Sequence, residues 1–160
     1  MRSIINKLIT LLFVFAFLQI PFFMMQYMNH LEGHYKELEI YHAELLNVAK
    51  KSNLSLESYV LHFEHSPDPI INGQGHVMAT TLDRFEEFGK ARAVYREATP
   101  WGKPFVFIRY LDRGVVGETL SSFQVGFSLS LESLIYMAIG FVVGLLISNH
   151  FTGKSKHGHV

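Results

Sequence analysis

Two long runs without a charged side chain lie near the two ends of the chain, from Leu8 to Leu31 and from Ser133 to Gly153. At about 1.5 Å of helical rise per residue, these runs reach roughly 36 Å and 31 Å, and the hydrocarbon core of a bilayer is about 30 Å thick. Each run is therefore long enough to cross a membrane as a helix. We predict transmembrane helices over residues 8–30 and 130–151.

Helical spacing continues past the first run. Apolar residues recur every three or four positions between charged ones, at Leu31, Tyr35, Leu38, Leu45 and Ala49. The first membrane helix is therefore expected to continue as an amphipathic stalk, which Ser52 and Asn53 end. A second helix is expected over 54–65, closed by Pro67 and Pro69.

A third helix is predicted over residues 76–98. Its apolar positions again follow helical spacing and are Met78, Leu82, Phe85, Phe88, Ala91 and Tyr95. An antiparallel hairpin of this helix and the stalk would bury both stripes. Asp68 and Pro69 are also compatible with a helix start, because proline is favoured at the first helical position. The glycine-rich stretch 73–75 is interpreted as a turn or a helix entry.

The segment after Pro100 allows two interpretations. Phe105 to Leu111 is aromatic and β-branched, but a lone strand would leave its backbone unpaired, which favours a helix near the membrane surface. Aromatic and basic residues that suit an interfacial position surround it, namely Trp101, Lys103, Arg109, Tyr110 and Arg113. The alternative is a set of core aromatics under a loop.

Several residues within the two spans are candidates for packing. Pro21 removes a backbone donor and is expected to kink the first span near Phe17, a defect that a neighbouring helix or Gln19 would repair. Gln19 and Gln26 are polar for a lipid-facing helix, so we expect them to point at protein. In the second span Ser130 is the expected N-cap and Glu132 lies in the first turn. Gly140 and Gly144 allow close packing, either against the first span or against a second copy.

The distribution of charge predicts the topology. All 14 acidic residues lie between Glu32 and Glu132 together with 10 Lys and Arg, whereas the ends carry only basic residues, Arg2, Lys7, Lys154 and Lys156. Short basic flanks stay in the cytoplasm, so residues 1–7 and 152–160 are expected there and residues 31–129 on the other side. No signal-peptidase site follows Ala16, so the first span is interpreted as an uncleaved anchor. The predicted fold is an all-α membrane protein with two transmembrane helices flanking an extracytoplasmic helical hairpin domain.

Candidate chemistry is sparse in this sequence. His30 and His34 share a helix face, but closed zinc sites need four ligands, usually with Cys, and the chain has no Cys. We therefore predict no metal site, no cofactor and no nucleic-acid partner. Nucleophile-elbow, phosphate-loop and zinc-protease motifs are absent, which favours a role other than catalysis.

The order of several short motifs resembles the domain of unknown function 2937 family over nearly the whole chain. The motifs are Gln19-x-Pro21, Gln26-Tyr27, Leu31-x-Gly33-His34, Glu37-Leu38, Ser66-x-Asp68-Pro69 and Leu131-Glu132-x-Leu134. The resemblance implies a small inner-membrane protein of Gram-negative bacteria with no established activity. It also indicates six candidate positions for interaction or packing, namely Gln26, Tyr27, Gly33, His34, Asp68 and Pro69. Structural alternatives are close helix packing at Gly33 and an interface anchor at Tyr27.

Three hypotheses of function remain from the sequence. The first is a structural, assembly or interaction component of the cell envelope that docks onto another protein or onto itself. The second is a membrane-surface hydrolase or transferase acting on lipid or cell-wall material, with His34 beside Glu37 or Asp68. The third is a metal-binding module built on His30 and His34.

Overall fold

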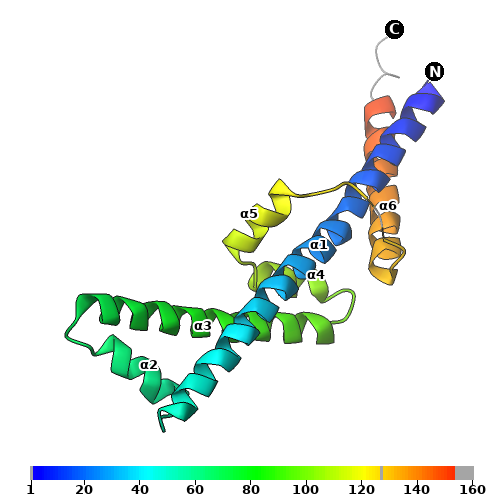
Figure 1. Cartoon of the computed structure of the whole chain (residues 1–160). Coiled ribbons are helices and arrows are strands. Elements are labelled where there is room, and N and C mark those ends of the chain that lie inside the picture. Colours follow the sequence, from blue (N-terminus) through cyan, green and yellow to red (C-terminus); the bar gives the residue numbers. More distant parts are fainter. Residues whose placement is uncertain (1, 127, 154–160) are drawn as a thin grey trace.

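The structure is a computed structural model that describes residues 2–126 and 128–153, and Figure 1 shows its course. The described residues form helices and no strand, which confirms the predicted all-helical class. The helices are α1 (Arg2–Lys51), α2 (Leu56–Glu64), α3 (Pro69–Glu97), α4 (Lys103–Arg109), α5 (Arg113–Ser121) and α6 (Leu131–Gly153). Most of the predicted tail 152–160, from residue 154 onward, lies outside the described residues.

Helix α1 is continuous over 50 residues and includes both the first apolar run and the stalk. The predicted stripe of the stalk is its packed face, because Leu31, Leu45 and Ala49 are buried. The helix ends where expected. Asn53 adopts a φ of 57°, and the amide of Leu54 donates to the carbonyl of Ala49 at 3.0 Å, which satisfies an otherwise free carbonyl at the helix end.

Helix α6 packs antiparallel against the first half of α1, and the start of α1 and the end of α6 lie at the same end of the molecule (Figure 1). A Cβ atom at Gly140 would lie 2.9 Å from the carbonyl oxygen of Phe13, and one at Gly144 would lie 2.8 Å from the Cα of Thr10. Both glycines therefore serve the packing of α6 against α1 within one chain, which is the first of the two roles expected for them. Because α1 already covers this face of α6, the face is not open to a second copy.

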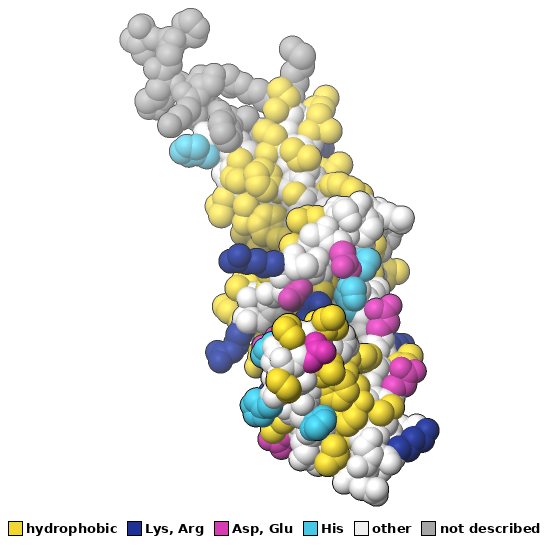
Figure 2. Space-filling view, turned by 60° about the vertical axis from the view of Figure 1, so that its left-hand side comes forward, with side chains coloured by type: hydrophobic (Ala, Val, Ile, Leu, Met, Phe, Trp, Pro, Cys, Tyr) yellow, Lys and Arg dark blue, Asp and Glu magenta, His cyan; other side chains and the backbone are white. Residues whose placement is uncertain are grey.

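The outer surface of the α1/α6 pair is apolar. Both helices are long and apolar enough to cross a membrane, as judged over the described residues. Their large apolar side chains point away from the pair, so that Leu12 and Leu146 are 65% and 66% exposed. Figure 2 shows this end of the molecule as mainly hydrophobic, with most charged and histidine side chains over the other elements. Monomeric soluble proteins rarely expose so large a continuous apolar surface.

Helices α2 and α3 form an arm that projects sideways from α1. Helix α2 turns back from the end of α1, and α3 then crosses α1, so the three helices outline a triangle (Figure 1). This arrangement differs from the expected antiparallel hairpin of α3 and the stalk. Two apolar clusters hold it, one of Leu45, Val60 and Met78 inside the triangle and one at the crossing, made of Tyr27, Leu31, Phe88, Ala91 and Val115.

The start of α3 corrects the sequence interpretation. The helix begins at Pro69 and not at residue 76, because the Asp68 carboxylate accepts from the amide of Ile70 at 2.8 Å and Pro69 occupies the first turn. The stretch 73–75 is therefore helical and is not a turn. Gly75 lies against the backbone of α2, where a Cβ atom would come within 2.7 Å of the carbonyl carbon of Phe63. Asn72 closes the same junction by donating to the carbonyl of Glu64.

Replacing Gly75 by Ala is expected to destabilise the arm, whereas the same change at Gly73 is not. The new methyl group at Gly75 meets backbone, and such overpacking costs about 1–3 kcal/mol. At Gly73 no atom lies within 4 Å of the added Cβ, so Ala gains up to about 1 kcal/mol of helix propensity. Thermal unfolding of the two variants in detergent, followed by circular dichroism, measures the difference. A Gly75→Ala variant as stable as Gly73→Ala would contradict the close approach of α2 and α3.

Replacing Gly144 by Leu is expected to separate α6 from α1 and to lower the free energy of unfolding by about 1–3 kcal/mol or more, because the side chain would enter the α1 backbone. Ala138 is exposed on another face of α6, so Ala138→Leu is the matched control. Exposed substitutions of this kind usually change stability by about 0.5 kcal/mol or less. The same unfolding measurement applies, and an equal loss in both variants would rule out the glycine contact.

Candidate functional site

The segment that leads into α6 is held along α1 by two glutamines. Gln26 donates from Nε2 to the carbonyl of Gln124 at 2.8 Å and accepts from the amide of the same residue at 3.3 Å. Gln19, seven residues earlier on the helix, accepts from the amide of Gly126 at 3.3 Å. Both side chains therefore point at protein, as expected. They provide hydrogen bonds to backbone groups that no regular structure satisfies.

Aromatic packing fixes the same segment. The ring of Phe123 lies 6.4 Å from that of Phe22 and 5.6 Å from that of Phe23. A Cβ atom at Gly126 would lie 2.6 Å from the Phe22 ring, so only glycine fits there without a shift. We call residues 123–126 the strap.

Pro21 has no amide hydrogen, so it leaves the carbonyl of Phe17 without its usual helical donor. The Gln19 side chain was expected to supply that hydrogen bond. It donates instead to the carbonyl of Phe15, at 3.2 Å.

Tyr27 is the centre of the junction between α1, α4 and α5. Its side chain is 1% exposed, and its hydroxyl accepts from the amide of Asp112 at 2.9 Å and donates to the carbonyl of Tyr110 at 3.3 Å. Its ring packs edge-on against Phe107, with 4.9 Å between centroids. Tyr27 is therefore a buried core residue that organises the turn from α4 to α5. It does not have the exposure of an interface anchor.

A pocket of about 190 Å³ lies beside this junction, between α1, the end of α3, the start of α4 and the start of α6. Its apolar wall consists of Pro21, Met24, Met25, Met28, Pro100 and Pro104. Its polar wall contains an ion pair between Lys103 and Glu132, both largely covered, and the ring of Tyr95, over which the Lys103 ammonium lies at 5.4 Å. Burial, reinforced by the nearby Glu132 carboxylate and then by Tyr136, raises the pKa of Tyr95 to about 12.

The pocket is suited to binding an amphiphilic group and offers little for catalysis. The opposite charges of Lys103 and Glu132 balance each other, and the Tyr95 hydroxyl, which like other tyrosine hydroxyls is protonated at neutral pH, can donate a hydrogen bond. The nearby Ser130 hydroxyl caps α6 by accepting from the amide of Ser133 at 3.2 Å, as expected. No activated nucleophile therefore faces the pocket among the residues that the structure describes.

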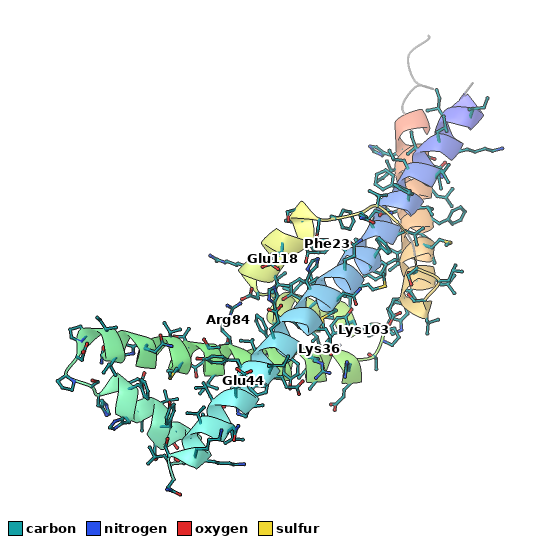
Figure 3. All side chains as sticks on the ribbon, viewed as in Figure 1. Phe23, Lys36, Glu44, Arg84, Lys103 and Glu118 are labelled. Atoms are coloured by element: carbon teal, nitrogen blue, oxygen red, sulfur yellow. The ribbon has the colours of Figure 1, made fainter. Side chains whose placement is uncertain are left out.

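Two histidine contacts occupy another side of α1, and Figure 3 shows Glu118 and Lys103 on opposite sides of this helix. His34 contacts the Glu118 carboxylate from Nε2 at 2.6 Å and lies 3.9 Å from Glu37 through Nδ1. His30 lies 3.1 Å from the hydroxyl of Ser122. That hydroxyl donates its hydrogen to the carbonyl of Glu118 at 2.9 Å, so it accepts from His30 and is not positioned to lose a proton to it.

Other candidate residues lie away from these contacts. Asp68 caps α3 and precedes Phe88, which packs near His34, by 20 residues, or about 30 Å of helix. An acid–base pair of His34 and Asp68 is therefore excluded by geometry. No atom lies within 4 Å of a Cβ added at Gly33, so this glycine does not mediate close packing. Within residues 2–126 and 128–153, no group of three or more His, Asp or Glu side chains has the arrangement of a metal site.

Sequence reasoning missed the partners of α1 that come from distant segments. Arg92 of α3 pairs with Glu32, joined by Arg96 at 3.3 Å, and lies over the Tyr35 ring at 4.6 Å. The Arg92 hydrogen bond is the main cause that lowers the pKa of Glu32. In the sequence, the one indication of these ion pairs was that charged residues lie between the apolar positions of both helices. Opposite charges on two predicted helices do not show which acidic residue pairs with which basic residue.

Comparison with known proteins gives a family and no activity. No curated protein and no solved structure matches this chain. A family model matches residues 1–153, which is nearly the whole chain. The chain therefore belongs to the family described as "Protein of unknown function (DUF2937)".

Proposed function

We propose that this chain is a two-pass protein of the bacterial inner membrane, with both termini in the cytoplasm and residues 31–129 on the extracytoplasmic side. The exposed apolar surface of the α1/α6 pair supports this, because a helix pair inside a soluble core would be covered. The start of α1 and the end of α6 lie at the same end of the pair, and the charges that flank the two apolar runs on this side in the sequence are basic.

The packing of α1 also supports an uncleaved anchor. Removal of the first apolar run would uncover the face of α6 that meets Thr10 and Phe13. The buried positions of α6 are small residues, Ser133, Gly140, Gly144 and Ser148, and the two glycines among them lie directly against α1. The strap would lose both of its glutamines in the same event if cleavage followed residue 26.

The proposed role is that of an interaction component of the cell envelope, which presents its arm to a protein partner. The observation that carries this role is the exposed apolar corner between α2 and α3, at the end of the arm farthest from α6 (Figure 1). Ile70 is 84% exposed there, and Leu61, Ile71 and Val77 are exposed beside it. The close approach at Gly75 and the hydrogen bond from Asn72 hold α2 against α3 beside this corner. An apolar surface that is already in its binding conformation favours docking, because less conformational entropy is lost on binding.

A membrane-surface hydrolase or transferase is the second candidate, favoured by one observation. The short contact between His34 and Glu118 resembles the pairing that orients a catalytic histidine. The Ser122 hydroxyl, which contacts His30, donates its hydrogen to the carbonyl of Glu118. A hydrolase or transferase built on these residues would therefore take its nucleophile from the substrate or from water.

The topology predicts the outcome of reporter fusions. A reporter that is active only in the cytoplasm, fused after Val160, is expected to be active, and the same reporter inserted after Asn53 is expected to be inactive. The converse pattern is expected for a reporter that is active only in the periplasm. Activity of the periplasmic reporter after Val160, or a mature protein that begins beyond Met25, would contradict the two-pass arrangement.

The interaction role predicts protein adducts at the corner of the arm. A photoreactive amino acid in place of Ile70, activated in native membranes, is expected to join a second protein, which mass spectrometry then identifies. An adduct of twice the chain mass would identify a second copy as the partner. Ile40 is a matched control, because it is the same residue type and is 62% exposed on α1, outside the corner. Recovery of unmodified monomer alone, or equal labelling at both positions, would count against the role.

A further inference from the structure

Helix α4 and the turn before it present an apolar surface that no other element of the described residues covers. Trp101, Phe105 and Ile108 are 64%, 76% and 71% exposed. The opposite face of the helix is packed, since the Phe107 ring meets Phe23 at 6.1 Å and Tyr27 at 4.9 Å. We call Trp101, Phe105 and Ile108 the α4 surface. It is a short amphipathic element whose apolar side faces outward.

Contacts with both long helices place α4 at one level of the α1/α6 pair. Lys103 at its start pairs with Glu132 in the first turn of α6, and Phe107 packs at Phe23 of α1. Glu132 precedes Gly140 by eight residues, about 12 Å of helix, and Gly140 packs beside Phe13 and Phe17. Antiparallel packing therefore brings Glu132 to a level near residue 23 of α1, the level of α4.

That level is where the apolar surface of the pair ends. From Ile4 to Phe23 the rise of α1 is about 29 Å, close to the thickness of a hydrocarbon core. This span lies nearer the N-terminus than the predicted residues 8–30, and the long side chain of Lys7 near its cytoplasmic end can extend to the interface. Beyond Phe23 α1 continues without α6, which begins at Leu131, and the exposed residues of α1 include Asn29 and Gly33. Charged side chains begin at the same level, with Glu132 on α6 and Lys103 and Arg109 on α4. The α4 surface thus continues the apolar surface of the pair at its edge.

We propose that the α4 surface lies in the outer membrane–water interface, with phospholipid as its occupant. This inference rests on the proposed two-pass topology. Tryptophan and other aromatic rings favour the headgroup level, and exposed basic residues favour anionic phosphate groups. Arg109 and Arg113 are exposed beside the surface and are available for such groups. The pocket between Tyr95 and Lys103 opens at the same level, so its apolar wall adjoins the same lipid.

The single tryptophan of the chain makes this placement measurable. The full chain is reconstituted into vesicles of phosphatidylcholine and phosphatidylglycerol, and lipids brominated either near the headgroup or near the chain ends quench nearby fluorescence. Trp101 is expected to lose most of its emission to bromine near the headgroup, less to bromine near the chain ends, and little to aqueous iodide. A Trp101→Phe, Ile70→Trp variant places the probe at the corner of the arm, where iodide is expected to quench and bromine is not.

The result separates the failure of this inference from the failure of the proposed topology. Vesicle flotation reports first whether the chain is inserted. A chain that floats and resists alkaline extraction, but whose Trp101 is quenched by iodide and not by brominated lipid, overturns the interfacial placement alone. Trp101 shielded from both quenchers also overturns it, since protein would then cover the surface. A chain that does not float overturns the topology and the placement together.

Discussion

Close contact between the backbones of α1 and α6 sets the level of every other element. Because Gly140 and Gly144 have no side chains, α6 can approach the carbonyl of Phe13 and the Cα of Thr10, and these two contacts define the register of the pair. That register brings the first turn of α6 to the end of the apolar surface. The strap, the Lys103–Glu132 pair and the pocket follow from this position. A larger side chain on this face would move all of them relative to α1.

Hydrogen bonds from side chains of α1 compensate for the irregular structure around it. The segments 110–112 and 123–126 form no helix, and their backbone groups pair with Tyr27, Gln26 and Gln19. Near a bilayer, water is a poor substitute for such partners, so polar residues in an apolar helix have a structural use. The residues that stand out in the sequence as polar exceptions are therefore positions of tertiary contact. Each of them forms hydrogen bonds with backbone groups of a distant segment.

Local patterns predicted α1, α2, α3 and α6, left α4 as one of two interpretations and did not reveal α5, and tertiary contacts decided the arrangement of all of them. Helical spacing identified the stalk and α3, the end of α1 at Ser52 and Asn53, and the cap at Ser130, because each depends on neighbours in sequence. The crossing of α3 over α1 depends on pairs such as Arg92 and Glu32, 60 residues apart, which no local pattern reveals. The stretch 73–75 was misjudged for the same reason, since glycine usually marks a turn and here makes room for the α2 backbone. The pocket draws on four separate segments, so only the fold could reveal it.

The unbroken course of α3 gives the arm the mechanics of a lever. The helix is buried where it crosses α1, at Phe88 and Ala91, and this crossing acts as the pivot. About 28 Å of helix extends from Phe88 to Pro69, and about 14 Å extends the other way to Glu97. A rotation of α3 about this crossing, together with the α2 helix that is packed on it, would move the end that leads into α4 about half as far as the end near Pro69 and in the opposite direction. Such a rotation would reach Lys103, six residues beyond Glu97, and its salt bridge to α6.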